Sequence, residues 1–186
     1  IEQGPILEKS NHALGVFTKI AAQLRSEIIL TGCAGHAGTI PASLRNDPLP
    51  VASEMVLAVN QMCKSDELIR ATVGHLEVIP NASNVIPGTV KFSIDMRYPD
   101  FKGLRRVHDK LSQKIKSIAK RSDLNFEYKL VHEASDAQLD QKLTDILAES
   151  CEVMQGSSPR MFSGAGHDSM KLAQVCPASM LAVRCK

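Results

Sequence analysis

One histidine of this chain stands among residues too small to pack against it. His36 lies in the segment Gly35-His36-Ala37-Gly38-Thr39. Small neighbours let a substrate or another stretch of backbone approach the ring closely. An imidazole in such a loop can donate a hydrogen bond to the oxyanion that develops during acyl transfer. The alternative is a turn histidine without a role, but the other motifs of the chain favour a catalytic His36.

An arginine and an asparagine bracket a segment whose alternation is typical of a strand. Arg97 closes the run Asp95-Met96-Arg97, and a guanidinium matches the two oxygens of a carboxylate. The alternative is a surface ion pair with Asp95, which shares its face of a strand. Asn84 begins Asn84-Val85-Ile86-Pro87-Gly88, where an asparagine often bonds only its own turn. Considered alone, each position favours the structural alternative.

Two glycine-containing segments complete the set of candidates. The segment Ser163-Gly164-Ala165-Gly166-His167-Asp168 precedes a short predicted helix, so its backbone N–H groups can face an anion. Gln3 lies in the turn-like Glu2-Gln3-Gly4-Pro5. The sequence contains no His-x-Asp, no Glu-Glu pair and no Gly-x-Ser-x-Gly. It also lacks a cluster of histidines and carboxylates at metal-ligand spacing, so a complete catalytic machine is not visible in these residues.

The elements that must position these residues have a recognisable order. Strands are predicted over residues 26–33, 68–79, 89–97 and 125–132, and helices from Pro48 and over 101–122. Asp47 is predicted to cap the first helix, with Pro48 at its first position. The order β-α-β-β-α-β is the ferredoxin-like plan, in which two helices cover one face of an antiparallel sheet.

The segments on either side of this predicted domain have elements that are typical of an α/β domain. They contain a strand predicted over 13–22, a helix over 136–155, a short helix over 168–174 and a buried strand over 180–183. Gly156 is the predicted C-terminal stop of the longer helix. We therefore predict an α+β chain in which a complete small domain, residues 24–132, is inserted in a partial α/β domain, residues 1–23 and 133–186.

Composition narrows the classes of function. The chain has 186 residues, a formal net charge of +2 and 44% hydrophobic residues. The basic residues from Lys114 to Arg121 have no aromatic residues interleaved, so we expect no nucleic-acid partner. No apolar run approaches the roughly 20 residues that span a bilayer, so we expect no membrane partner. Five cysteines occur singly, which favours reduced thiols and a cytoplasmic location.

Four motifs together resemble one enzyme family. They are Glu-Gln-Gly-Pro-Ile-Leu-Glu at 2–8, Gly-His-Ala-Gly-Thr at 35–39, the segment 84–97 and Ser-Gly-Ala-Gly-His-Asp at 163–168. The set is similar to the amidase/hydantoinase–carbamoylase branch of the M20 metallopeptidase clan, and most of all to allantoate amidohydrolases. The resemblance runs through nearly the whole chain. It departs at Pro41-Ala42, where many relatives have Pro-Met.

The resemblance implies a metal-dependent hydrolase that releases ammonia and carbon dioxide from the ureido group of allantoate or a similar N-carbamoyl amino acid. Residues 24–132 would form a lid that also joins two copies as a homodimer. Gln3, His36, Asn84, Arg97 and Gly166 would bind substrate. Among them, Asn84 and Arg97 would hold the substrate carboxylate, while His36, often of the partner subunit, would polarise the scissile carbonyl.

The resemblance also places the metal chemistry outside this chain. Two divalent metal ions, manganese or zinc, would be held by ligands before Ile1 and after Lys186. Because the chain begins without methionine and ends directly after an apolar strand, we expect an internal and inactive piece of a larger enzyme. The alternatives are an N-carbamoyl-L-amino acid hydrolase or ureidoglycolate amidohydrolase, a peptide-cleaving member of the clan, and a non-catalytic dimerisation or small-molecule-binding module.

Overall fold

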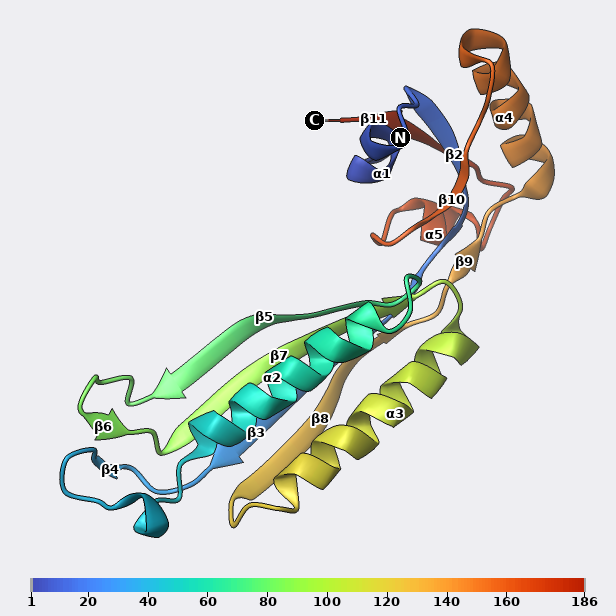
Figure 1. The fold of residues 1–186 in the computed structure, drawn as a ribbon. Coiled ribbons are helices and arrows are strands. Elements are labelled where there is room, and N and C mark those ends of the chain that lie inside the picture. Colours follow the sequence, from blue (N-terminus) through green and yellow to red (C-terminus); the bar gives the residue numbers. More distant parts are fainter. Residues whose placement is uncertain (1, 186) are drawn as a thin grey trace. The chain divides into compact units, whose positions relative to one another are not determined.

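The chain divides into two compact units, each with its own sheet. A computed structural model describes the backbone of residues 2–185 and the side chains of residues 5–185 (Figure 1). The central unit comprises Gln23–Tyr98 and Lys102–Ala134. The flanking unit comprises the chain up to Ala22, the short link Pro99–Phe101, and the chain from Ser135 onward.

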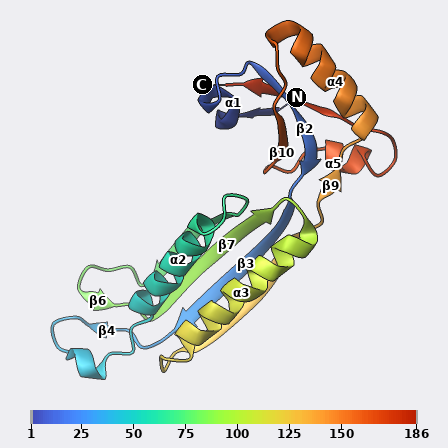
Figure 2. The same ribbon diagram turned by 45° about the vertical axis from the view of Figure 1, so that its right-hand side comes forward.

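The central unit has the predicted ferredoxin-like order. Its main elements are β3 (Ala22–Thr31), α2 (Pro48–Lys64), β5 (Arg70–Ile79), β7 (Thr89–Tyr98), α3 (Phe101–Ala119) and β8 (Asn125–Ala134). The four strands form a sheet in the order β5-β7-β3-β8. Both helices cover the same face of this sheet, as the two views in Figures 1 and 2 show. The α+β prediction is therefore confirmed, and the other face of the sheet is left uncovered by helices.

Alternation along β7 decides which side chains reach the core. One set of positions is buried beneath the helices: Val90, Phe92, Ile94 and Met96. The intervening set lies on the uncovered face and is polar: Lys91, Ser93, Asp95 and Arg97. Successive side chains of a strand point to opposite faces, so burial of the first set fixes the direction of the second. The uncovered face is called the open face below.

Local signals at the helix ends are mostly confirmed. Asp47 accepts the backbone N–H of Leu49 at 3.0 Å, so it caps α2 as predicted. Gly156 has a φ of 84° and ends α4 (Gln141–Gln155) in the left-handed conformation. The predicted start of α4 at residue 136 is wrong. Asp140 accepts the N–H of Leu143 at 2.8 Å, and the preceding β9 (Ala137–Gln138) pairs with another strand.

The loop that carries His36 is held by hydrogen bonds between distant segments. The strand predicted over 26–33 ends at Thr31, because the next two N–H groups bond elsewhere. Gly32 donates to the carbonyl oxygen of Gly88, and Cys33 donates to that of Asn46, each at 2.9 Å. A Cβ on Gly32 would lie 2.0 Å from the Asn46 oxygen, so this close approach requires glycine.

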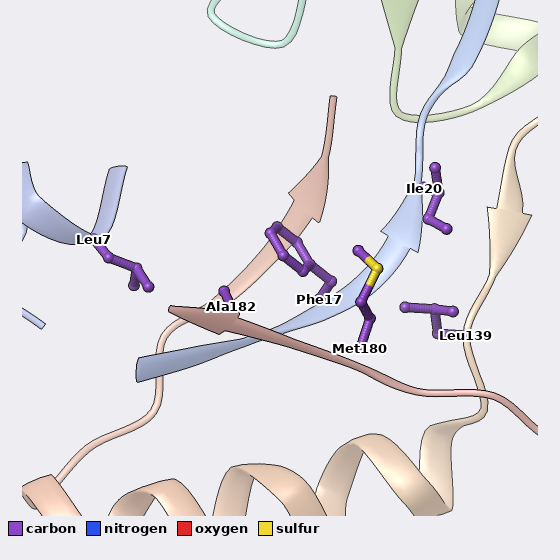
Figure 3. Close-up of a cluster of buried hydrophobic side chains, with 6 residues drawn as sticks. All are labelled: Leu7, Phe17, Ile20, Leu139, Met180 and Ala182. Carbon is purple, nitrogen blue, oxygen red and sulfur yellow. The ribbon is translucent and has the colours of Figure 1, made fainter. Parts of the chain in front are cut away.

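The flanking unit contains a mixed sheet. Its strands run β1 (Glu2–Gly4), β11 (Met180–Arg184), β2 (Leu14–Ile20) and β10 (Arg160–Ser163), and β9 also pairs with β2. Its remaining helices are α1 (Pro5–Lys9), which was not predicted, and α5 (Ser169–Leu172). Figure 3 shows one core cluster: Leu7, Phe17, Ile20, Leu139, Met180 and Ala182. A second cluster, Val16, Ala148 and Cys151, includes residues of α4. Adjacent residues of β2 thus enter two cores, as in a layered α/β domain.

Two findings concern membrane-spanning helices and disulfide bonds. No helix among residues 2–185 is long and apolar enough to cross a membrane. All five cysteines are free thiols.

Phe92 tests whether the β7 alternation holds the central unit together. Phe92→Ala should lower the free energy of unfolding by about 3–5 kcal/mol, because it leaves a cavity beneath the two helices. Leu44→Ala is the matched control, since Leu44 is 75% exposed in the same unit, and should change it by less than about 0.5 kcal/mol. Urea denaturation of both variants measures the difference, and equal losses would contradict this account.

Candidate functional site

A small ladder brings His36 and Asn84 together. β4 (Gly35–His36) and β6 (Val85–Ile86) pair antiparallel, with His36 opposite Val85. The next bond of this ladder runs from the N–H of Ala37 to the carbonyl oxygen of Asn84, at 2.9 Å. Sequence analysis did not predict these two short strands. Two candidate residues that are 48 positions apart therefore lie at one end of the central unit.

The His36 ring is oriented by its own loop. The backbone N–H of Gly38 donates to His36 Nδ1 at 3.1 Å. When Nδ1 accepts a hydrogen bond, the neutral imidazole carries its proton on Nε2. A Cβ at Gly38 would lie 3.2 Å from His36 Cε1, so a larger residue would crowd the ring. The exposed His36 can thus present an Nε2–H donor to a bound carbonyl or oxyanion.

Arg97 is held by Asp95 on the open face. Arg97 Nε donates to Asp95 Oδ1 at 2.8 Å, and Nη2 donates to Oδ2 at 3.2 Å. The carboxylate also accepts from Arg25 Nε at 3.0 Å and from Gln23 Nε2 at 2.6 Å. The ion pair anticipated as an alternative to substrate binding therefore exists. It also fixes the plane of the guanidinium, which a carboxylate-binding arginine needs.

The same cluster keeps Asp95 ionised. Burial alone would raise the pKa of Asp95, but the hydrogen bonds and positive charge of Arg97 oppose it. With further hydrogen bonds from Arg25 and Gln23, the net effect lowers the pKa of Asp95 below its ordinary value of 3.8. At neutral pH the carboxylate is therefore charged.

The structure does not bring Arg97 near His36 and Asn84 within one chain. Arg97 is near the end of β7, whereas Thr89 begins β7 on the side of the β4–β6 ladder (Figure 1). Eight residues separate Thr89 from Arg97, so the two ends of this strand lie about 27 Å apart at the usual rise per residue. The central unit thus carries its candidate residues at two opposite ends.

Gly166 and Gln3 belong to the flanking unit. Ser163 Oγ accepts from the N–H of Ala165 at 3.2 Å and lies 3.1 Å from His167 Nε2, which shapes the loop around the exposed Gly166. A Cβ on Gly166 would meet only Met170 Sδ, at an ordinary 3.7 Å. Gln3 pairs with Val183 through its backbone, and its side chain lies outside the described residues. The roles of both residues stay predictions.

Sequence analysis missed the residues that surround Arg97. A groove of about 670 Å³ in the central unit is lined by Arg97, Asp95, Arg25 and Arg70, among others. Arg25 follows Gln23 at the period of two that marks one face of β3. Because the strand was predicted to begin at residue 26, this signal was overlooked.

Metal ligation is not supported by the donors present. Among the side chains of residues 5–185, no group of three or more from histidine, cysteine, aspartate or glutamate could hold a metal ion. The charged groups of the open face instead form ion pairs, such as Arg97 with Asp95 and Lys91 with Glu27. The described part of the chain therefore offers hydrogen-bond donors and positive charge, and the substrate-binding roles of these residues stay predictions.

The central unit is ferredoxin-like and has candidate residues at both ends, and comparison with known proteins gives its class. The family model for the peptidase dimerisation domain matches residues 18–123, and the chain belongs to this M20 family. It is 36% identical to the N-carbamoyl-L-amino-acid amidohydrolase of Pseudomonas sp. strain NS671, covering 100% of this chain and 45% of that protein. It is 34% identical to the allantoate deiminase of Arabidopsis thaliana, covering 100% of this chain and 41% of that protein.

Comparison with solved structures also indicates similarity to amidases of the hydantoinase/carbamoylase family. The crystal structure of an amidase of the hydantoinase/carbamoylase family from Burkholderia multivorans aligns with a TM-score of 0.93 and 37% identity, over 100% of this chain and 45% of that chain. The resemblance inferred from the motifs is therefore confirmed. The chain spans less than half the length of these relatives.

The Asp95 cluster predicts a dependence of stability on pH. Because the folded-state pKa of Asp95 is lowered, the cluster contributes stability above the unfolded pKa and loses it as the pH falls through the folded pKa. The difference in unfolding free energy between the wild type and Asp95→Asn should be largest near neutral pH and shrink below about pH 4. Urea denaturation across this range measures it. A difference that does not change with pH would contradict the assignment.

Proposed function

We propose that the protein containing this chain is an amidohydrolase that cleaves the ureido C–N bond of allantoate or a similar N-carbamoyl amino acid, releasing ammonia and carbon dioxide. The observation that carries the proposal is the β4–β6 ladder, which holds His36 beside Asn84 and orients its ring. The names of the relatives, N-carbamoyl-L-amino-acid amidohydrolase and allantoate deiminase, support the ureido substrate class.

Each candidate residue has a role in this proposal. Arg97 and Asn84 bind the substrate carboxylate, and His36 Nε2–H donates to the carbonyl oxygen as it gains negative charge. Gln3 contributes its side chain, and Gly166 contributes a backbone contact. Binding the carboxylate restricts the orientation of the ureido group, which lowers the entropic part of the barrier.

The proposed cofactor is a pair of divalent metal ions, manganese or zinc, held elsewhere in the whole protein. The described side chains, those of residues 5–185, do not fit such a site. Bound ions of this kind lower the pKa of a coordinated water and so supply the nucleophile. The described residues serve the other half of the reaction, which is recognition of the substrate and stabilisation of charge on its carbonyl.

The separation of Arg97 from His36 favours a site shared between two copies. β5 is an edge strand of the central sheet, and an edge can pair with another chain. If two copies pair through β5 in antiparallel fashion, the Ile79 end of one strand meets the Arg70 end of the other. This arrangement carries the His36 loop of one copy toward Arg97 of its partner.

Surface chemistry favours β5 over the other edge. Both edges expose apolar side chains: Leu76 of β5 is 51% exposed and Val131 of β8 is 60% exposed, so charge distinguishes them. The β8 edge carries more charge, including Lys129, which forms an ion pair with Glu127, and charged groups protect an edge from pairing. We propose a homodimer through β5, which is consistent with membership of the dimerisation domain family.

His36 is the residue to test first. In the whole protein, His36→Ala should lower kcat by about 10²–10³-fold with a small change in KM, as expected for the loss of one oxyanion donor. Release of ammonia from allantoate and from N-carbamoyl amino acids measures the effect. His132→Ala provides a control, since His132 is also exposed in the central unit. A near-normal kcat for His36→Ala would exclude the role.

Mixing two inactive variants tests the shared site. His36→Ala and Arg97→Ala subunits, denatured and refolded together in equal amounts, should regain about a quarter of wild-type activity, because half of the dimers are mixed and each holds one intact site. Each variant refolded alone is the control. If mixing restores nothing although the mixed dimers form, the two residues act within one subunit and the β5 dimer does not build the site.

A further inference from the structure

The groove on the central sheet holds more positive charge than one substrate carboxylate requires. Three guanidinium groups line it, from Arg25 of β3, Arg70 of β5 and Arg97 of β7. Its two carboxylates already take part in ion pairs. Asp95 binds both Arg25 and Arg97, and the other carboxylate, Glu27, binds a lysine on β7.

Most of the open face matches opposite charges across its strands. Glu77 of β5 stands opposite Lys91 of β7, and Glu27 of β3 stands opposite Lys129 of β8. Lys91 Nζ also lies 3.0 Å from Glu27 Oε1. Cross-strand pairs of opposite charge stabilise a sheet. The charged residues in this part of the open face are therefore placed as expected if they only stabilise the folded sheet.

Arg70 departs from that arrangement. It is paired directly with Arg97 across β5 and β7, so two like charges project from neighbouring positions on one face. Such pairs destabilise a sheet. Arg70 Nη1 donates to the carbonyl oxygens of Glu67 and, at 3.2 Å, of Ile69, which anchors the guanidinium at the start of β5. Asp95 offsets the charge of Arg97 through its ion pair, and Arg70 adds a further fixed cation beside it on the groove, which suits recognition of an anion.

We propose that Arg70 binds a second anionic group of the substrate, so that the preferred substrates are N-carbamoyl amino acids whose side chain carries a carboxylate. The inference rests on the function proposed above, in which Arg97 holds the first carboxylate. Arg70 stands opposite Arg97 on the ladder, where paired Cα atoms are about 4.5–5.5 Å apart. The two arginines therefore leave the sheet from neighbouring positions of the groove, where each guanidinium can bind one carboxylate of a substrate that has two.

A pair of substrates that differ only in charge provides the test. N-carbamoyl-L-aspartate and N-carbamoyl-L-asparagine have nearly the same shape, and only the first has a second carboxylate. In the whole protein we expect kcat/KM to favour the aspartate compound by about tenfold or more, mainly through KM. Arg70→Gln should abolish this preference while leaving the asparagine compound unaffected, and Arg70→Lys should retain part of it.

The control variant is Arg105→Gln. Arg105 is a half-buried arginine of the same unit that forms an ion pair with Glu133 on β8 and does not line the groove. The Arg105→Gln variant should keep the wild-type preference for N-carbamoyl-L-aspartate over N-carbamoyl-L-asparagine.

Three outcomes overturn the proposal. The first is a wild type that cleaves ureido acids without preferring the charged compound. The second is an equal loss on both compounds in Arg70→Gln, which places Arg70 on the shared carboxylate or in the support of the fold. The third is a wild type that releases no ammonia from these compounds or from allantoate, and it alone overturns the proposed function as well.

Discussion

The alternation of β7 is the constraint on which the candidate site depends. Phe92, Ile94 and Met96 are buried beneath the two helices, and this burial turns Asp95 and Arg97 toward the groove. A slip of one residue in the pairing of β7 would exchange the two faces. It would bury two charged groups, which is far more costly than losing their ion pair. The hydrophobic core of the central unit therefore determines where the two proposed substrate-binding groups point.

The length of β7 has a second consequence. It is long enough to keep Arg97 away from the His36 loop, so a substrate as small as an N-carbamoyl amino acid cannot contact both within one copy. A homodimer resolves this difficulty, because antiparallel pairing of two edge strands places opposite ends side by side. On this account dimerisation completes the site, and weakening the β5 edge should affect catalysis as well as association.

Sequence predicted the features that short-range patterns determine. The alternation of β7, the Asp47 cap and the Gly156 stop all follow from neighbouring residues, and each is present. Features that depend on distant hydrogen bonds were missed. The β4–β6 ladder pairs residues 49 and 51 positions apart, and β3 begins earlier than predicted, which places Arg25 on the strand beside the groove. The Arg97–Asp95 pair was anticipated, but only the structure shows how Asp95 gathers several donors.

The Arg70–Arg97 pair connects stability with recognition. In the folded protein, Arg70 lies opposite Arg97, whose charge Asp95 offsets. An anion that contacts both arginines can do so only when β5 and β7 are paired, so it binds the folded state more tightly than any unfolded one and stabilises it by mass action. β5 is also the edge through which we propose that two copies pair. Anion binding and dimerisation would then support each other through one strand, since each favours an ordered β5.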